Sequence, residues 1–187
     1  MGGKELDTLI LKASEEADKM KNYMNKKEGK KYKDDTWAES EATFKAMLYH
    51  QLIKNGLEYW NISMENSLEA EDKKIASKRV DIWIDKMKVN YLLEVKMVGV
   101  NRKTKGLRRV NNKAGLYGDL IKLTELVKYK KNDGHTFGTA IAVYNGHNST
   151  INCKYIESGL KDEVTSLLTR YVRLIICANG GCLYVKR

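Results

Sequence analysis

The sequence has no proline, only three cysteines and no long apolar run. Because proline is missing, sharp breaks between secondary-structure elements must come from glycine and asparagine. With three cysteines, at least one thiol cannot pair within the chain, so a disulfide framework is not expected. A membrane-spanning helix needs about 18 or more consecutive apolar residues, and no run approaches that length. These absences favour a globular protein without a membrane segment.

The N-terminal segment MGGKELDTLI has no basic flank followed by an apolar stretch, so a secretory signal is not expected. We therefore expect an intracellular, cytoplasmic protein. The 187 residues suffice for one domain with a buried core, and a content of 42% hydrophobic and 31% charged residues is typical of globular chains.

The chain is strongly basic. Lysine and arginine number 34 against 24 acidic residues, which gives a formal net charge of +10. Such an excess favours polyanionic partners such as nucleic acid. Much of the charge lies in two clusters, residues 26–33 (KKEGKKYK) and 101–109 (NRKTKGLRR). A basic cluster by itself fits a solvated loop as well as a binding site.

Hydrophobic periodicity predicts the order of elements along the chain. Helices are expected over residues 4–24, 36–55, 114–131 and 159–171, and strands over 58–68, 78–85, 91–98 and 136–145. A hairpin follows over 173–187, with its turn at Asn179-Gly180. Apart from the first helix, the order is αβββαβ followed by αββ. We divide the chain into an N-terminal amphipathic helix with a basic linker, residues 1–33, and a main domain, residues 34–187.

The strand YLLEVKMVG carries a glutamate and a lysine in an otherwise apolar run, and a buried charge is costly unless it is paired or bound. Side chains alternate along a strand, so Glu94 and Lys96 point to the same face. On the preceding strand, the apolar set comprises Val80, Ile82 and Ile84. Asp81 belongs to the opposite set. If the two strands are antiparallel neighbours, Asp81 lies beside Glu94 and Lys96.

A further acid, Glu41, lies on the predicted helix 36–55. At about 100° per residue, it falls in the middle of the expected buried stripe. The other members of this stripe are Trp37, Phe44, Leu48 and Leu52. A carboxylate in such a stripe is unusual unless it faces a site. The alternative is a helix-start glutamate that the helix dipole favours or that reaches solvent past Trp37.

Asp81, followed thirteen residues later by Glu94-Val95-Lys96 within an αβββαβ order, resembles the PD-(D/E)XK nuclease superfamily. The resemblance covers roughly residues 37–145. It implies an α/β protein of the restriction-endonuclease-like fold, with an αβββαβ core and a mixed central sheet. This chain adds an N-terminal helix and a C-terminal hairpin. The proline of the motif is missing here, and so is the Gln-x-x-x-Tyr element of the exonuclease branch.

The resemblance also implies roles for the candidate site residues. In the superfamily, the aspartate and the glutamate hold a divalent metal, the lysine serves the attacking water, and the first core helix often adds a glutamate. These roles fall on Asp81, Glu94, Lys96 and Glu41, with the Val95 carbonyl as a further metal ligand. Glu41 is expected to bind a second metal or a metal-bound water. Mg²⁺ suits such oxygen ligands and lowers the pKa of bound water, and Mn²⁺ is expected to substitute. The alternative is an ion pair of Glu94 with Lys96 on a solvated strand face.

Basic residues follow the strand that carries Glu94 and Lys96. A basic segment that leaves an active-site strand is well placed to bind phosphates. The expected nucleic-acid-binding residues are Arg102, Lys103, Lys105, Arg108, Arg109 and, in the next helix, Lys122.

The cysteines and histidines carry weaker signals. Cys177 and Cys182 flank the Asn-Gly turn and are expected to face each other across the hairpin. With no further ligands nearby, a zinc site is not expected, and we interpret both as buried free thiols. The three histidines show no metal-ligand spacing.

Together these features predict a Mg²⁺-dependent DNA endonuclease that hydrolyses phosphodiester bonds. A homodimer is expected from the family and from the apolar stripe of residues 6–24, which has no predicted partner in the chain. The alternative is a non-catalytic nucleic-acid-binding module on the same fold, which the intact set of Asp81, Glu94 and Lys96 disfavours. The form of the DNA, its sequence and the biological pathway stay open.

Overall fold

The computed structural model describes residues 2–28, 41–67, 78–86, 89–100, 106–130, 135–146 and 150–185. The elements are α1 (Gly3–Glu28), α2 (Glu41–Lys54), η3 (Tyr59–Asn61), β1 (Ile62–Ser67), β2 (Arg79–Lys86), β3 (Val89–Met97), β4 (Gly99–Val100), β5 (Leu107–Arg108), α4 (Leu116–Tyr129), β6 (His135–Tyr144), α5 (Cys153–Ser158), α6 (Asp162–Thr165), β7 (Val172–Ala178) and β8 (Gly181–Val185). Trp37 and most of the basic cluster 26–33 lie outside the described residues.

Six strands form one mixed sheet in the order β1-β2-β3-β6-β7-β8. The pairs β3–β6 and β6–β7 are parallel, and the other neighbours are antiparallel. The order α2-β1-β2-β3-α4-β6 is the predicted αβββαβ core, α1 precedes it and the β7–β8 hairpin ends it. The predicted fold class is therefore confirmed. None of the described helices is both long and apolar enough to cross a membrane.

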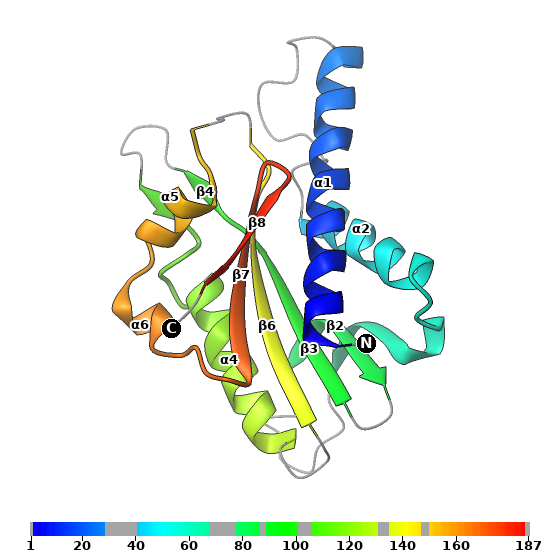
Figure 1. The fold of residues 1–187 in the computed structure, drawn as a ribbon. Coiled ribbons are helices and arrows are strands. Elements are labelled where there is room, and N and C mark those ends of the chain that lie inside the picture. The colour runs from blue at the N-terminus through cyan, green and yellow to red at the C-terminus, as the bar shows by residue number, and fades with distance from the viewer. Residues whose placement is uncertain are drawn as a thin grey trace.

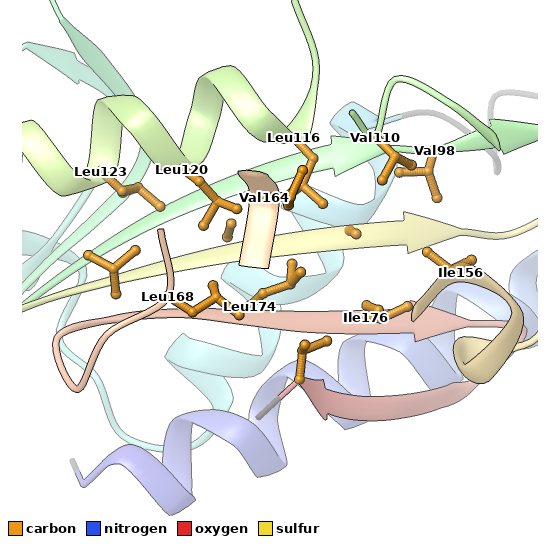
Figure 2. Close-up of a cluster of buried hydrophobic side chains, with 14 of the residues drawn as sticks. Val98, Val110, Leu116, Leu120, Leu123, Ile156, Val164, Leu168, Leu174 and Ile176 are labelled. Atoms are coloured by element: carbon orange, nitrogen blue, oxygen red, sulfur yellow. The ribbon is translucent and has the colours of Figure 1, made fainter. Parts of the chain in front are cut away.

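Helices cover both faces of the sheet, with α1 and α2 on one side and α4 on the other (Figure 1). Each face has its own buried core. The core under α4 includes Leu92, Leu116, Leu120, Leu123, Leu174 and Ile176, and Figure 2 shows its centre. The core under α1 and α2 includes Leu6, Ile10, Phe44, Leu48, Ile82, Leu93 and Val95. Each core therefore combines the apolar face of one or two helices, which has helical periodicity, with one face of the sheet, which has alternating periodicity.

The sequence predicts that Val80, Ile82 and Ile84 share one face of β2. This is right for Ile82 and Ile84, which lie under α1 and α2, but wrong for Val80. Val80 is buried in the core under α4. The β2–β3 ladder ends at the pair Ile82 and Leu93. Beyond that pair, β2 is no longer held to the plane of β3, so the regular alternation of faces does not extend to Val80.

The single helix predicted over residues 159–171 was also wrong. Only the short helix α6 (Asp162–Thr165) lies within this range, and another short helix, α5 (Cys153–Ser158), precedes it. Asn152 caps α5 by accepting from the Tyr155 N–H, 2.9 Å away. After α6, the Thr169 hydroxyl accepts from the N–H groups of Tyr171 and Val172, which takes these donors away from a continuing helix. The predicted hairpin is confirmed, since Asn179 and Gly180 both have the positive φ that a two-residue turn of this kind requires.

The apolar stripe of α1, predicted to be free for a second copy, is covered within the chain. Leu6 and Ile10 are fully buried in the core shared with α2. Polar contacts fix both ends of the helix. Near its start Arg173 Nη1 lies 2.7 Å from Asp7 Oδ1, and near its end Lys21 Nζ donates to Asn179 Oδ1 at 3.0 Å. This stripe therefore gives no support to a homodimer, which stays a prediction.

We expect α1 to be integral to the stability of the protein. Ile10→Ala should lower the free energy of unfolding by about 2–5 kcal/mol, because it empties a fully buried position. Leu11→Ala, at a side chain that is 36% exposed, is the matched control and should cost about 0.5 kcal/mol or less. Denaturant melts measure both changes. Equal small losses would mean that α1 contributes little to the core.

Candidate functional site

Asp81 sits where β2 and β3 part. Its Oδ2 accepts a hydrogen bond from the Val95 N–H at 2.7 Å, so the carboxylate continues the contact between the strands after the ladder has ended. Its Oδ1 lies 3.2 Å from the Nζ of Lys45, which comes from α2. The side chain is only 12% exposed. This position fixes the carboxylate from two sides.

Glu94 is the most deeply buried charged group of the site, with a side chain 3% exposed. Its Oε1 lies 2.7 Å from the Nζ of Lys122, which α4 supplies, and Lys122 also donates to the Arg79 carbonyl at 2.9 Å. Burial, with a smaller contribution from the nearby Asp81 carboxylate, raises the pKa of Glu94 to about 8, although the positive charge of Lys122 opposes the shift. Glu94 is therefore held in an environment that disfavours its charge.

Lys96 lies between two carboxylates from opposite faces of the sheet. Its Nζ is 3.6 Å from Glu41 Oε2 and 3.6 Å from Asp119 Oδ2. Burial lowers the pKa of Lys96, but the negative charges of Asp119 and Glu41 outweigh burial, so the pKa is raised overall. Lys96 therefore keeps its charge, and its ammonium group joins α2 to α4 across the edge where the strands part.

Glu41 is the first residue of α2, and its side chain is 29% exposed. The buried stripe predicted for this helix is confirmed at Phe44, Leu48 and Leu52. The helix dipole favours an acid at this position, which agrees with the alternative that Glu41 is a helix-start glutamate. The carboxylate nevertheless faces the other charged groups, because it contacts Lys96.

Asp119 was not among the predicted site residues. It lies in the first turn of α4, and burial raises its pKa although Lys96 lowers it. Within the described part of the chain, Asp119 Oδ2 is buried without a hydrogen-bond partner. The signal for it in the sequence is its spacing, since Asp119 and Lys122 are three residues apart on a helix and share a face.

Lys45 and Glu65 were also missed. Lys45 contacts Asp81, Glu41 and Glu65, and its side chain is 12% exposed. Burial lowers the pKa of Lys45, but its bonds to Glu65 and Asp81 raise the pKa overall. Glu65 has a positive φ of 51° within β1, between Met64, which pairs with Ile82, and Asn66, which pairs with Val80. Lys45 follows Glu41 by four residues, and this helical spacing is the signal that identifies it.

The predicted nucleic-acid-binding residues fall into three groups. Arg108 and Arg109 are exposed, on β5 and directly after it. Arg102, Lys103 and Lys105 lie outside the described residues. Lys122 is not part of an exposed basic surface but contacts Glu94 inside the cluster. Their binding roles stay predictions.

The cluster is rich in the oxygen donors that Mg²⁺ prefers. Five carboxyl groups and three ammonium groups contact one another through the pairs described above. The donor chemistry fits a divalent ion, and so does the buried Asp119 Oδ2, which accepts no hydrogen bond from the described parts of the chain and lies 3.6 Å from Lys96 Nζ. The lysines, however, stand between the acids, and no three His, Cys, Asp or Glu side chains converge on one point among the described residues. Lys45 and Lys122 would therefore be direct neighbours of an ion held by Asp81 and Glu94.

Comparisons with known proteins give only a distant likeness. No family model matches the chain, and no curated protein sequence matches it. Among solved structures, the chain is similar to that described as "The structure of Pyrococcus Furiosus SfsA in complex with Ca2+", with a TM-score of 0.39 and 12% sequence identity. The likeness covers 76% of this chain and 62% of the SfsA chain, so it spans less than two thirds of that protein.

The burial of Glu94 predicts a pH dependence of stability. Its pKa of about 8 in the folded chain lies above the ordinary value of 4.5. Its contribution to stability is therefore full below pH 4.5 and is lost as pH rises through 8, because only the unfolded chain releases the proton in this window. The slope is at most about 1.4 kcal/mol per pH unit.

Denaturant melts over this pH range should show the slope in the wild type and its loss in Glu94→Gln, which keeps the shape of the side chain. Glu163→Gln, an exposed substitution on α6, is the matched control and should behave as the wild type. Parallel slopes for wild type and Glu94→Gln would contradict the pKa shift.

Proposed function

We propose that this protein is a Mg²⁺-dependent nuclease that hydrolyses phosphodiester bonds of DNA. The observation that carries the proposal is the position of Lys96. It stands among the carboxylates of Glu41, Asp119 and Glu94, at the edge where β2 leaves β3. The alternative, an ion pair of Glu94 with Lys96 on a solvated strand face, would involve β3 alone. In the structure, charged groups from α2, β2, β3 and α4 form one cluster.

The proposed roles follow from the positions of the side chains. Asp81 and Glu94, with the Val95 carbonyl, are the residues that would hold Mg²⁺. When bound, Mg²⁺ supplies an acidified water and a Lewis acid for the scissile phosphate. Lys96, which keeps its charge, orients the attacking water and stabilises negative charge that develops on the phosphate. Glu41 orients the Lys96 ammonium, since it contacts that group directly.

In this proposal Lys122 has two alternative partners, the Glu94 carboxylate and a phosphate of the DNA. It is bound to Glu94 in the structure. If Glu94 turns to a metal ion, Lys122 loses its carboxylate partner and becomes free to contact a phosphate of the DNA. This exchange reconciles the position of Lys122 in the cluster with its predicted role in binding nucleic acid.

A second candidate function is a non-catalytic nucleic-acid-binding module. The observation that favours it is that lysines already contact Asp81, Glu94 and Asp119, and that no three acids converge within the described residues. In that case the cluster serves as an internal ion-pair network, and the basic charge of the chain serves binding alone. Cleavage and binding assays separate the two candidates.

Lys96→Met should reduce cleavage of DNA by roughly 10²–10⁴-fold, because it removes the group that serves the water. Lys128→Met, at an exposed position in the last turn of α4, is the matched control and should cleave as the wild type. Each variant is assayed on duplex, branched and single-stranded DNA with Mg²⁺, Mn²⁺ or EDTA. If the wild type binds DNA but cleaves none of these forms with either metal, the binding module is the correct candidate.

Binding to DNA should depend on the basic segment after β3. Neutralising Arg102, Lys103 and Lys105 should weaken binding and reduce the slope of log K against log salt by about 0.9 for each lost contact with a duplex phosphate. A variant that neutralises Lys19, Lys54 and Lys128 instead changes the net charge equally and serves as the control. Equal slopes in the two triple variants would mean that only net charge matters.

A further inference from the structure

Independently of the nuclease proposal, we propose that Cys177 and Cys182 form a redox-active dithiol site that reacts with small disulfides to close a disulfide across the C-terminal hairpin. The two cysteines are direct partners in the β7–β8 ladder. Their Sγ atoms lie 2.8 Å apart. Both are free thiols in the structure.

The backbone already has the geometry that a disulfide needs. The hairpin turns at Asn179 and Gly180, so Ala178 and Gly181 form the pair that closes the turn. In an antiparallel ladder the next pair outward is of the non-hydrogen-bonded type, with Cα atoms about 4.5 Å apart. Disulfides bridge Cα distances of about 4.4–6.8 Å. Closing the bond therefore needs a side-chain adjustment and no change of register.

The two thiols differ in access, which sets the order of the reaction. Cys177 is completely buried, and burial raises its pKa well above the ordinary value. Cys182 is only half-buried. The Cys182 thiolate therefore attacks first, forms a mixed disulfide with the small reagent and releases one small thiolate. Cys177 then gives its proton to that thiolate and attacks the Cys182 sulfur, and the second small thiolate leaves and takes up from solvent the proton that Cys182 had released. One small disulfide is reduced to two thiols, and the protein gains one disulfide.

The third cysteine is a neighbour but not a member of the pair. Cys153, at the start of α5, donates from its Sγ to the carbonyl of Ile176 at 3.3 Å. The same Sγ lies 3.6 Å from the Gly181 carbonyl, so the thiol contacts backbone carbonyls of β7 and β8. This contact makes Cys153 the natural control, because it lies beside the site and is not needed for the reaction.

The position of the pair gives the modification a structural consequence. The turn next to it is a junction, where Asn179 accepts from Lys21 of α1, donates through its side chain to the Ile151 carbonyl, and donates through its N–H to the Tyr144 carbonyl. Figure 1 shows α1 passing beside the hairpin. A disulfide next to the turn would hold this junction together even when the end of β8 separates from the sheet.

The test compares folded and unfolded protein, because the two cysteines are close in sequence and would also meet by chance in an unfolded chain. The Cys153→Ala variant of the full chain, which retains only this pair, is equilibrated with mixtures of reduced and oxidised glutathione, with and without urea. Alkylation followed by mass spectrometry counts the free thiols. The equilibrium constant for closing the disulfide should be at least tenfold larger in the folded chain, which corresponds to about 30 mV.

Peptide mapping of oxidised wild-type protein should find Cys177 linked to Cys182. An equal or smaller constant in the folded chain would overturn the proposal. So would a link from Cys153 to either partner as the main product, or glutathione that stays attached to Cys182, since the latter means that Cys177 cannot complete the exchange. The mapping uses unmutated protein, so a variant that fails to fold does not affect it.

Discussion

The structure depends on one constraint, which is that carboxylates buried at the centre of a sheet must be paired. Asp81 and Glu94 lie on the two middle strands of the αβββαβ core, where apolar side chains surround them. Their partners Lys45 and Lys122 come from helices on opposite faces of the sheet. Removing one member of a buried pair commonly costs about 3–5 kcal/mol, because the other charge is left uncompensated. The cluster therefore positions α2 and α4 against the sheet as well as forming the candidate site.

The same constraint explains why β2 and β3 separate at this point. Beyond the pair Ile82 and Leu93 the ladder ends, and the Asp81 carboxylate takes over the Val95 N–H that would otherwise need another acceptor. An opening between two strands makes room for charged side chains from both faces. Lys96 uses this opening, since one ammonium group contacts Glu41 on one side and Asp119 on the other.

The sequence could predict what local pattern determines. Period-two alternation placed Glu94 and Lys96 on one face, helical periodicity placed Phe44 and Leu48 in a core, and the Asn-Gly step marked the hairpin. It could not predict what distant contacts determine. Asp81 meets Lys45 across 36 positions of the chain, and no local pattern encodes that meeting. Val80 was misplaced for the same reason, because its face depends on where the ladder with β3 ends.

Charge balance is the step that connects this cluster to the proposed chemistry. When all are ionised, five carboxylates against three ammonium groups leave two negative charges in a cluster whose acids range from Glu94, 3% exposed, to Glu65, 56% exposed. Burial is the main cause that raises the pKa of Glu94 and of Asp119, and the nearby Asp81 carboxylate adds to both shifts, so the neutral form of each group is favoured. One divalent cation carries the charge that would balance the excess and would draw those protons off. In a purely structural network, a surplus of acids over lysines lowers stability, because each unpaired carboxylate adds a desolvation cost without a compensating contact. The surplus of acids is thus the physical feature that supports the proposed metal-dependent chemistry.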